Sequence, residues 1–173
     1  MKVSSNQLKS LQVPIKDKYR VDPNSALLTL RAESQTTEGL SCKIQTEKIL
    51  LEAGLHPATG GDGSQVCSGD MLLEALVACA GVTLKAVATS MDIDLKDAKV
   101  IAEADLDFRG TLGVSKEVPV GFVNLRLTFE LDSDASDTSL DKLVELTERY
   151  CVVLQTIKHS PEISIVRSKA TIS

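Results

Sequence analysis

The chain has 173 residues, of which 43% are hydrophobic, 25% are charged and only 3% are aromatic, which fits one globular domain with an aliphatic core. The formal net charge is −5 and the sequence pI is about 5.1, and this acidity argues against nucleic acid or an anionic membrane as a partner.

The first part of the chain, residues 1–25, is a polar and weakly basic arm. It has no apolar stretch or cleavage site of a secretion signal, so we expect a cytoplasmic protein whose thiols stay reduced unless they cycle. We expect at most one or two short amphipathic helical turns, because Pro14 and Pro23 limit a longer helix. We expect this arm to dock on the surface of a single domain formed by residues 26–173.

Short strands are expected next, over residues 26–32 and 40–46, with a turn at residues 36–39 between them and a third short strand near residues 49–51. The loop at residues 56–64 is rich in glycine but lacks the Gly-Lys-Ser/Thr ending of a phosphate loop. We therefore expect no nucleotide cofactor.

A long apolar helix is predicted over residues 69–91, because alanine, leucine and methionine dominate and no proline interrupts them. Between Met71 and Met91 the only charged residues are Glu74 and Lys85, and the apolar positions do not form a single stripe. Such a helix is either buried or a membrane span. Its polar start and the acidic segment after it favour a buried helix in a soluble protein.

A hairpin and a second helix follow. Residues 100–109 and 123–132 alternate between apolar and polar side chains, which predicts two long antiparallel strands around a turn at residues 110–121. An amphipathic helix is expected over residues 139–158 and a last strand over residues 162–169.

This order of elements predicts an α+β fold with antiparallel strands around a long buried central helix. A helix that is apolar on all sides needs cover on all sides. One set of strands and one further helix supply little of that cover, so we expect a second copy of the chain to supply the rest in an obligate homodimer.

The cysteines are the main candidates for chemistry. They are Cys42, Cys67, Cys79 and Cys151. There is no Cys-X-X-Cys pair, and His56 and His159 lack the spacing of a zinc site, so we expect no metal. Cys79 and Cys151 each lie on the apolar side of a long helix and face one core. Buried structural thiols would show the same pattern, and both interpretations stay open at this point.

The sequence resembles a known family at these two cysteines. The segment SGDMLLEALVACAGVTL around Cys79 resembles the first motif of the OsmC/Ohr family, the osmotically inducible and organic hydroperoxide resistance proteins. The segment ERYCVVLQTI resembles the second motif, usually Cys-Pro-Val-Ser with a following Thr-Leu, from which Val152 and Leu154 depart. ADLDFRGTLG resembles one branch of the family, and the resemblance runs from about residue 26 to the end.

The resemblance implies an intertwined α+β dimer with two active sites at the subunit interface. It also implies a thiol peroxidase that acts on organic hydroperoxides and is reduced by dithiols such as lipoyl groups. By this resemblance Cys79 is the peroxidatic cysteine and Cys151 the resolving one. A Cys79 thiolate would attack the peroxide and become a sulfenic acid, and Cys151 would condense with it to a disulfide that a dithiol then opens.

An apolar site alone would raise the pKa of a thiol, and family members supply an arginine held by an acidic residue. The corresponding acid is Asp70. Alternatively, Asp70 only provides a favourable negative charge at the start of a helix. Glu74 is a weaker candidate for the acid. The candidate arginines are Arg31 and Arg109. Strand alternation puts Arg109 on the wet face with neighbouring aspartates, where a surface ion pair is the alternative.

Two other functions stay open. The chain could be a non-catalytic dimer that holds a hydrophobic ligand or partner, with structural cysteines. It could also be a cysteine acyl hydrolase, which requires a histidine base, and neither His56 nor His159 lies in a recognisable motif.

Overall fold

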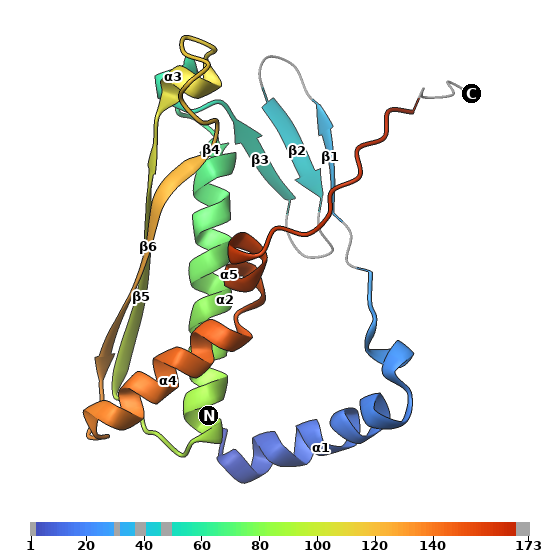
Figure 1. The fold of residues 1–173 in the computed structure, drawn as a ribbon, viewed down its shortest axis with the longest axis vertical. Helices are drawn as coiled ribbons and strands as arrows, with labels where there is room; N and C mark the ends of the chain where they lie inside the picture. The colour runs from blue at the N-terminus through green and yellow to red at the C-terminus, as the bar shows by residue number, and fades with distance from the viewer. Residues whose placement is uncertain (1–2, 30–31, 37–40, 46–49, 169–173) are drawn as a thin grey trace.

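The computed structural model describes residues 3–29, 32–36, 41–45 and 50–168. Its centre is helix α2, Ser68–Ser90, which has the predicted position and length. The two-stranded sheet of β5 and β6 runs along one side of α2, and helices α4 and α5 pack against another (Figure 1). This arrangement confirms the predicted combination of a central helix with antiparallel strands.

The N-terminal arm contains a longer helix than predicted. Helix α1, Ser5–Val21, continues through Pro14. Ser4 and Gln7 form a reciprocal cap at its start, in which the Gln7 N–H donates to Ser4 Oγ (3.2 Å) and the Ser4 N–H to Gln7 Oε1 (2.9 Å). Pro14 therefore does not end the helix, although it removes one backbone donor. No residue of α1 is buried.

The first predicted strand is wrong. A 3₁₀ helix, Pro23–Ala26, occupies its beginning, and Leu27 and Leu28 follow as exposed, non-strand residues. Pro23 favours this helical turn because its ring fixes a helical φ. The first strand, β1, lies later, at Glu33–Thr36. The rest of residues 26–32 includes Arg31, which lies outside the described residues.

The next strands are confirmed. Strand β2, Ser41–Gln45, pairs antiparallel with β1 and with β3, Leu50–Gly54, and the short β4, Val66–Cys67, adds in parallel to β3. A 3₁₀ turn, Pro57–Thr59, interrupts the glycine-rich loop between β3 and β4. Most of the turn predicted at residues 36–39 lies outside the described residues.

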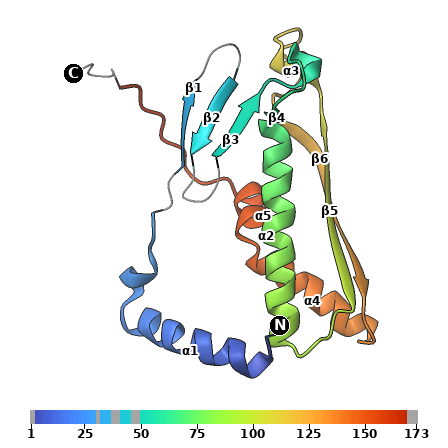
Figure 2. The same cartoon turned by 180° about the vertical axis from the view of Figure 1, so that it is seen from behind.

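Only one face of α2 is buried within a single chain. Leu76, Ala80, Leu84 and Ala88 form that buried stripe at intervals of four. Val82 is 74% exposed and Leu72 is 42% exposed. Seen from behind, none of the described helices or strands lies over the near face of α2 (Figure 2). The expectation of burial on all sides is therefore not met in one chain.

In the described ranges, α2 is also the one helix long and apolar enough to cross a membrane by length and composition. A core helix of a soluble protein meets the same criteria. The stripe of α2 that packs on the sheet and on α4 and α5 has the character of such a core helix.

The predicted hairpin is confirmed. Strand β5, Asp97–Leu106, pairs antiparallel with β6, Phe122–Asp132, and a bulge interrupts the pairing between Glu103 and Asp105. A short helix, α3, Phe108–Thr111, forms part of the connection. The alternation of β6 turns Leu125, Leu127 and Phe129 toward the core clusters around α2.

The predicted second helix is broken. It consists of α4, Asp137–Tyr150, and α5, Val152–Lys158, with Cys151 in an extended conformation between them (φ −73°, ψ 105°). The Gln155 side-chain amide donates to the Glu148 carbonyl oxygen (2.8 Å) across this break. The break satisfies a carbonyl at the end of α4 and turns Cys151 into the core, where it is fully buried.

The last predicted strand does not form in the single chain. Residues 161–168 have no strand pairing, and Lys169 lies outside the described residues. Ile163, Ile165 and Val166 are more than two-thirds exposed. A strand needs a neighbour to accept and donate its backbone hydrogen bonds, and no described strand pairs with this segment.

Candidate functional site

Two cysteines from distant parts of the sequence meet in the core. Cys79 lies midway along α2, and Cys151 lies at the junction of α4 and α5. Cys151 is fully buried in a cluster with Leu76 and Ala80, and the half-buried Cys79 packs against the same cluster. Both thiols are free, and they lie in one packed cluster. The structure therefore brings together the two cysteines that the sequence singled out.

The surroundings of Cys79 favour its thiolate. Burial opposes ionisation of the thiol, but hydrogen bonds from the Val153 N–H, the Cys151 thiol, the Val152 N–H and the Thr83 hydroxyl outweigh that effect. The pKa of Cys79 therefore lies below its usual value. The groups that lower it are neutral donors.

Cys151 has the opposite tendency. Burial raises the pKa of the Cys151 thiol, and its hydrogen bond to Cys79 and the charge of the Cys79 thiolate raise it further. Cys151 thus keeps its proton under conditions in which Cys79 loses one. The pair combines a nucleophilic thiolate with an adjacent neutral thiol, which is the arrangement needed to form a disulfide after oxidation of Cys79.

The structure places Arg109 in a surface ion pair. Its side-chain Nε donates to both carboxylate oxygens of Asp107 (3.0 and 3.1 Å), and Nη2 donates to Oδ2 (2.5 Å). The Arg109 side chain is 64% exposed, and its hydrogen bonds hold the pKa of Asp107 at about 2. Helix α3, which carries Arg109, lies at the end where α2 begins, whereas α5 lies against the middle of α2 (Figure 1).

The other predicted partners do not meet Cys79 in the described chain. Asp70 is exposed in the first turn of α2, about two and a half turns before Cys79. Glu74 is also exposed. Arg31 lies outside the described residues. The structure thus brings Cys79 to Cys151 but brings neither Arg109 nor Asp70 to them.

Sequence reasoning missed three donors to Cys79. Thr83 follows Cys79 by four residues and therefore shares its helix face, a signal that was present in the sequence. The N–H groups of Val152 and Val153 became available only through the break at Cys151. The continuous helix predicted over residues 139–158 would have used them for its own hydrogen bonds.

The remaining cysteines and histidines lie elsewhere. Cys67 precedes α2, in contact range of Gly69, and the side chain of Cys42 lies outside the described residues. The His56 ring stacks on Phe108 (4.8 Å between centroids), and His56 Nδ1 accepts from the Ala58 N–H (3.0 Å). His159 is exposed just after the end of α5. In the described ranges, no group of histidine, cysteine, aspartate and glutamate side chains could hold a metal.

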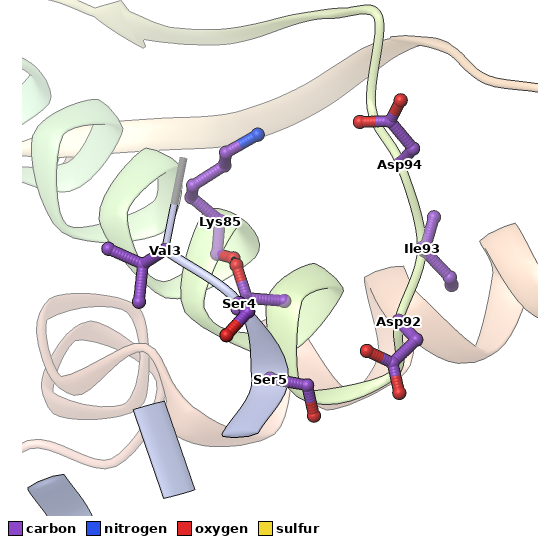
Figure 3. Close-up of a pocket in the computed structure, with 8 residues that line it drawn as sticks. Val3, Ser4, Ser5, Lys85, Asp92, Ile93 and Asp94 are labelled. Carbon is purple, nitrogen blue, oxygen red and sulfur yellow. The ribbon is translucent and has the colours of Figure 1, made fainter. Parts of the chain in front are cut away.

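A cavity of about 500 Å³ lies away from the cysteine pair, between the start of α1 and the turn after α2. Figure 3 shows Lys85 beside Val3 and Ser4 of the arm on one side, with Asp92 and Asp94 on the other. Its lining mixes charges of both signs and contains neither cysteine, so it is not part of the candidate site.

The sequence matches a family model described as OsmC-like protein over residues 61–166, which is more than half of the 173-residue chain. The matched range includes both cysteines and leaves out α1. No curated protein sequence matches the chain.

Solved structures share the fold at low sequence identity. An OsmC-like protein from Mycoplasma pneumoniae is 14% identical with a TM-score of 0.65, and the match covers 77% of this chain and 89% of that one. An organic hydroperoxide resistance protein OsmC from Legionella pneumophila is 18% identical, with a TM-score of 0.60 and coverage of 77% and 91%.

An organic hydroperoxide resistance protein from Elizabethkingia anophelis is 15% identical, with a TM-score of 0.61 and coverage of 78% and 91%. These likenesses establish the fold and confirm the predicted α+β architecture.

Proposed function

Because the chain belongs to the OsmC-like protein family, we propose that it is a thiol-dependent peroxidase that reduces organic hydroperoxides to alcohols. The observation that carries this proposal is the contact between Cys79 and Cys151, whose pKa values lie on opposite sides of the ordinary thiol value. A pair of inert structural thiols gains nothing from such a difference, whereas a peroxidatic and a resolving cysteine require it.

In the first step the Cys79 thiolate attacks the terminal oxygen of the hydroperoxide. The sulfur–oxygen bond forms as the oxygen–oxygen bond breaks, so sulfur loses two electrons and the peroxide gains them. The alkoxide takes a proton and leaves as the alcohol, and Cys79 becomes a sulfenic acid. The hydrogen bonds from Val152, Val153 and Thr83 support this step because they hold the sulfur as the nucleophilic anion.

In the second step Cys151 condenses with the sulfenic acid. Its sulfur attacks Cys79, a disulfide forms, and the oxygen leaves as water after taking the Cys151 proton. The packing of Cys79 against the cluster that contains Cys151 supports this role, because Cys151 is already close when Cys79 is oxidised. The disulfide protects Cys79 from further oxidation.

In the third step an external dithiol resets the enzyme. One thiolate of the reductant attacks the protein disulfide, a mixed disulfide forms, and the second thiol of the reductant displaces the remaining cysteine. Both protein thiols are restored and the reductant leaves as its own disulfide. A lipoyl-type dithiol or another small dithiol fits this step.

The substrate class follows from the surroundings of Cys79. Side chains of the cluster around it are aliphatic or aromatic and include Leu76, Leu154, Leu125 and Phe129. Transfer of an apolar group into such surroundings is favourable, by about 25 cal/mol per Å² of apolar surface. We therefore assign alkyl or aryl hydroperoxides rather than hydrogen peroxide as substrates.

A homodimer belongs to the same proposal. The uncovered face of α2 carries Val82, which is 74% exposed, and Leu72, which is 42% exposed, and both would be covered by a second copy. The exposed apolar residues Ile163 and Ile165 are a further segment that gains a neighbour if two chains combine.

The proposal is tested by supplying reduced protein with cumene hydroperoxide and dihydrolipoamide and by following loss of the peroxide. Catalytic loss is expected for the wild type and for Cys67→Ser, the matched control, because Cys67 is remote from the pair. Cys79→Ser should abolish it. Peroxide loss that persists in Cys79→Ser, or no loss in the wild type, would contradict the peroxidase and favour a non-catalytic binding module.

A further inference from the structure

The uncovered face of α2 carries the two charges that follow the first turn of this helix. Glu74 and Lys85 are both exposed and lie about three helical turns apart, so they share one face of α2. The buried stripe from Leu76 to Ala88 lies on the opposite side. None of the ion pairs among the described residues includes either charge. Both side chains can therefore reach a neighbouring molecule.

Between these charges the face consists of small side chains. Ala75 and Ala78 are exposed, and Val82 is 74% exposed. Small side chains let two helices pack closely, with their axes about 8 Å apart. The occupant that fits this face is therefore another helix, with charges that complement Glu74 and Lys85.

A second copy of α2 has those charges in the antiparallel orientation. In a two-fold contact, every contact between two different positions occurs twice. Residue 80 lies midway between Ala78 and Val82, and close to the midpoint between Glu74 and Lys85. A two-fold axis beside residue 80 places Glu74 against the partner's Lys85 and Ala78 against the partner's Val82. A parallel pair in register would instead place like charges together.

We propose that Glu74 and Lys85 form reciprocal ion pairs across an antiparallel contact between the α2 helices of two copies, and that these pairs fix the register of the homodimer. This inference deepens the homodimer of the proposed function and rests on it. Charges across an interface select the partner and the register more than they raise affinity. Lys85 also lines the open cavity of about 500 Å³ at the end of α2, so its ammonium has room for a carboxylate from a second chain (Figure 3).

Reversal of one charge at a time tests the pair. Glu74→Lys leaves two positive charges on the face, and Lys85→Glu leaves two negative ones. Both positions are exposed, so each variant should keep the fold. Each homodimer then has two repulsive contacts in place of two attractive ones, and we expect its dissociation constant to rise by about tenfold. Sedimentation velocity over a concentration series measures this change.

A mixture of the two variants separates charge pairing from a general loss of the interface. In a dimer of Glu74→Lys with Lys85→Glu, both reciprocal contacts again join opposite charges. The two proteins, one of them labelled with heavy nitrogen, are unfolded together in urea, refolded and weighed by native mass spectrometry. If each homodimer is about tenfold weaker, about 90% of the dimers should be mixed, against about half for random pairing.

The matched control reverses charges that pair within one chain. Lys142 and Glu145 form an exposed ion pair in α4 (2.7 Å). A mixture of Lys142→Glu with Glu145→Lys should therefore contain about half mixed dimers, the share for random pairing. A chain that carries both Glu74→Lys and Lys85→Glu should regain the wild-type dissociation constant, because each contact again joins opposite charges.

Random pairing of Glu74→Lys with Lys85→Glu would overturn the inference. So would a doubly reversed chain that dimerises as weakly as the single variants, or a wild type that is a monomer at micromolar concentration. None of these measurements uses peroxide. A protein with selective pairing that reduces no hydroperoxide would retain this interface and lose the proposed peroxidase, and an active peroxidase with random pairing would do the reverse.

Discussion

Cys79 packs against the buried cluster that contains Cys151, and the pKa values of the two thiols are displaced in opposite directions. Cys79 comes from the central helix and Cys151 from the junction of two helices that pack on it. Their contact depends on the packing of α2 against α4 and α5 and on the extended conformation of Cys151.

Replacement of Cys151 by serine separates the two proposed thiol roles. The serine hydroxyl can still donate a hydrogen bond to Cys79, so the first reaction with hydroperoxide should survive. No disulfide can follow, and we expect one equivalent of alcohol per subunit, after which Cys79 is over-oxidised to sulfinic acid. Product quantification and intact-mass spectrometry check this. Sustained turnover by Cys151→Ser would show that Cys151 does not resolve the sulfenic acid.

Replacement of Arg109 by alanine should leave Cys79 unaffected. The Arg109 side chain pairs with Asp107 in α3 and is 64% exposed. We expect Arg109→Ala to keep the wild-type pH midpoint of Cys79 alkylation by iodoacetamide and the wild-type rate of peroxide reduction. A higher pH midpoint of Cys79 alkylation in Arg109→Ala would show that Arg109 is the cation that activates Cys79. Arg126→Ala, which removes another exposed arginine paired with an aspartate, is the matched control.

The same ion pair predicts a dependence of stability on acid. The pKa of Asp107 is about 2 in the folded chain, below its ordinary value of 3.8, because of hydrogen bonds from Arg109. The unfolded chain binds this proton at higher pH, so the pair stabilises the fold above about pH 4 and that stabilisation is lost as the pH falls through about 2. In Asp107→Asn, the free energy of unfolding measured in urea should fall less steeply over this acid range than in the wild type. An unchanged profile would show that the pair has no effect on folding.

The uncovered face of α2 predicts a dimer that a single charge can split. Val82 is 74% exposed in one chain, so Val82→Asp should leave the folded chain intact. If a second copy covers this face, the buried carboxylate should shift the protein from dimer to monomer, because an unpaired charge in an interface is costly. Sedimentation velocity distinguishes the two states. A wild-type monomer at micromolar concentration, or a Val82→Asp protein that remains a dimer, would rule out this interface.

The core around the cysteines predicts a large effect of truncating Leu76. This residue is fully buried in the cluster that contains Cys151, and Leu→Ala at such positions costs about 2–5 kcal/mol. The control is Leu112→Ala, since Leu112 is 54% exposed and should change stability by less than about 0.5 kcal/mol. Urea unfolding measures both. Equal losses at the two positions would show that the cluster is not the main core.

Periodicity was sufficient to predict the long elements. The apolar composition of α2 and the alternation along β5 and β6 depend on local sequence, and both elements formed where these patterns placed them. The same patterns predicted that Cys79 and Cys151 share one core, because each lies on the apolar side of a predicted helix. The break at Cys151 could not be predicted, since the apolar spacing of residues 139–158 suits a continuous helix.

The sequence was less informative where structure depends on pairing or on a special conformation. Residues 162–168 have the composition of a strand, but a strand needs a neighbour, and no strand among the described residues pairs with them. Helix α1 continues through Pro14 because a capped start and the residues around it outweigh one lost donor. Arg109 could not be placed from strand parity, since the strand ends at Leu106 and Arg109 belongs to a short helix.

The central claim is that Cys79 and Cys151 form one redox pair, and peptide mapping of protein oxidised by cumene hydroperoxide tests it most directly. Fully reduced protein is treated with one equivalent of peroxide, the remaining thiols are blocked, and disulfide-linked peptides are identified by mass spectrometry. We predict an intramolecular bond between Cys79 and Cys151, with Cys67 and Cys42 still blocked as thiols. A bridge that contains Cys67 or Cys42, or four blocked thiols after complete mixing with peroxide, would contradict the claim.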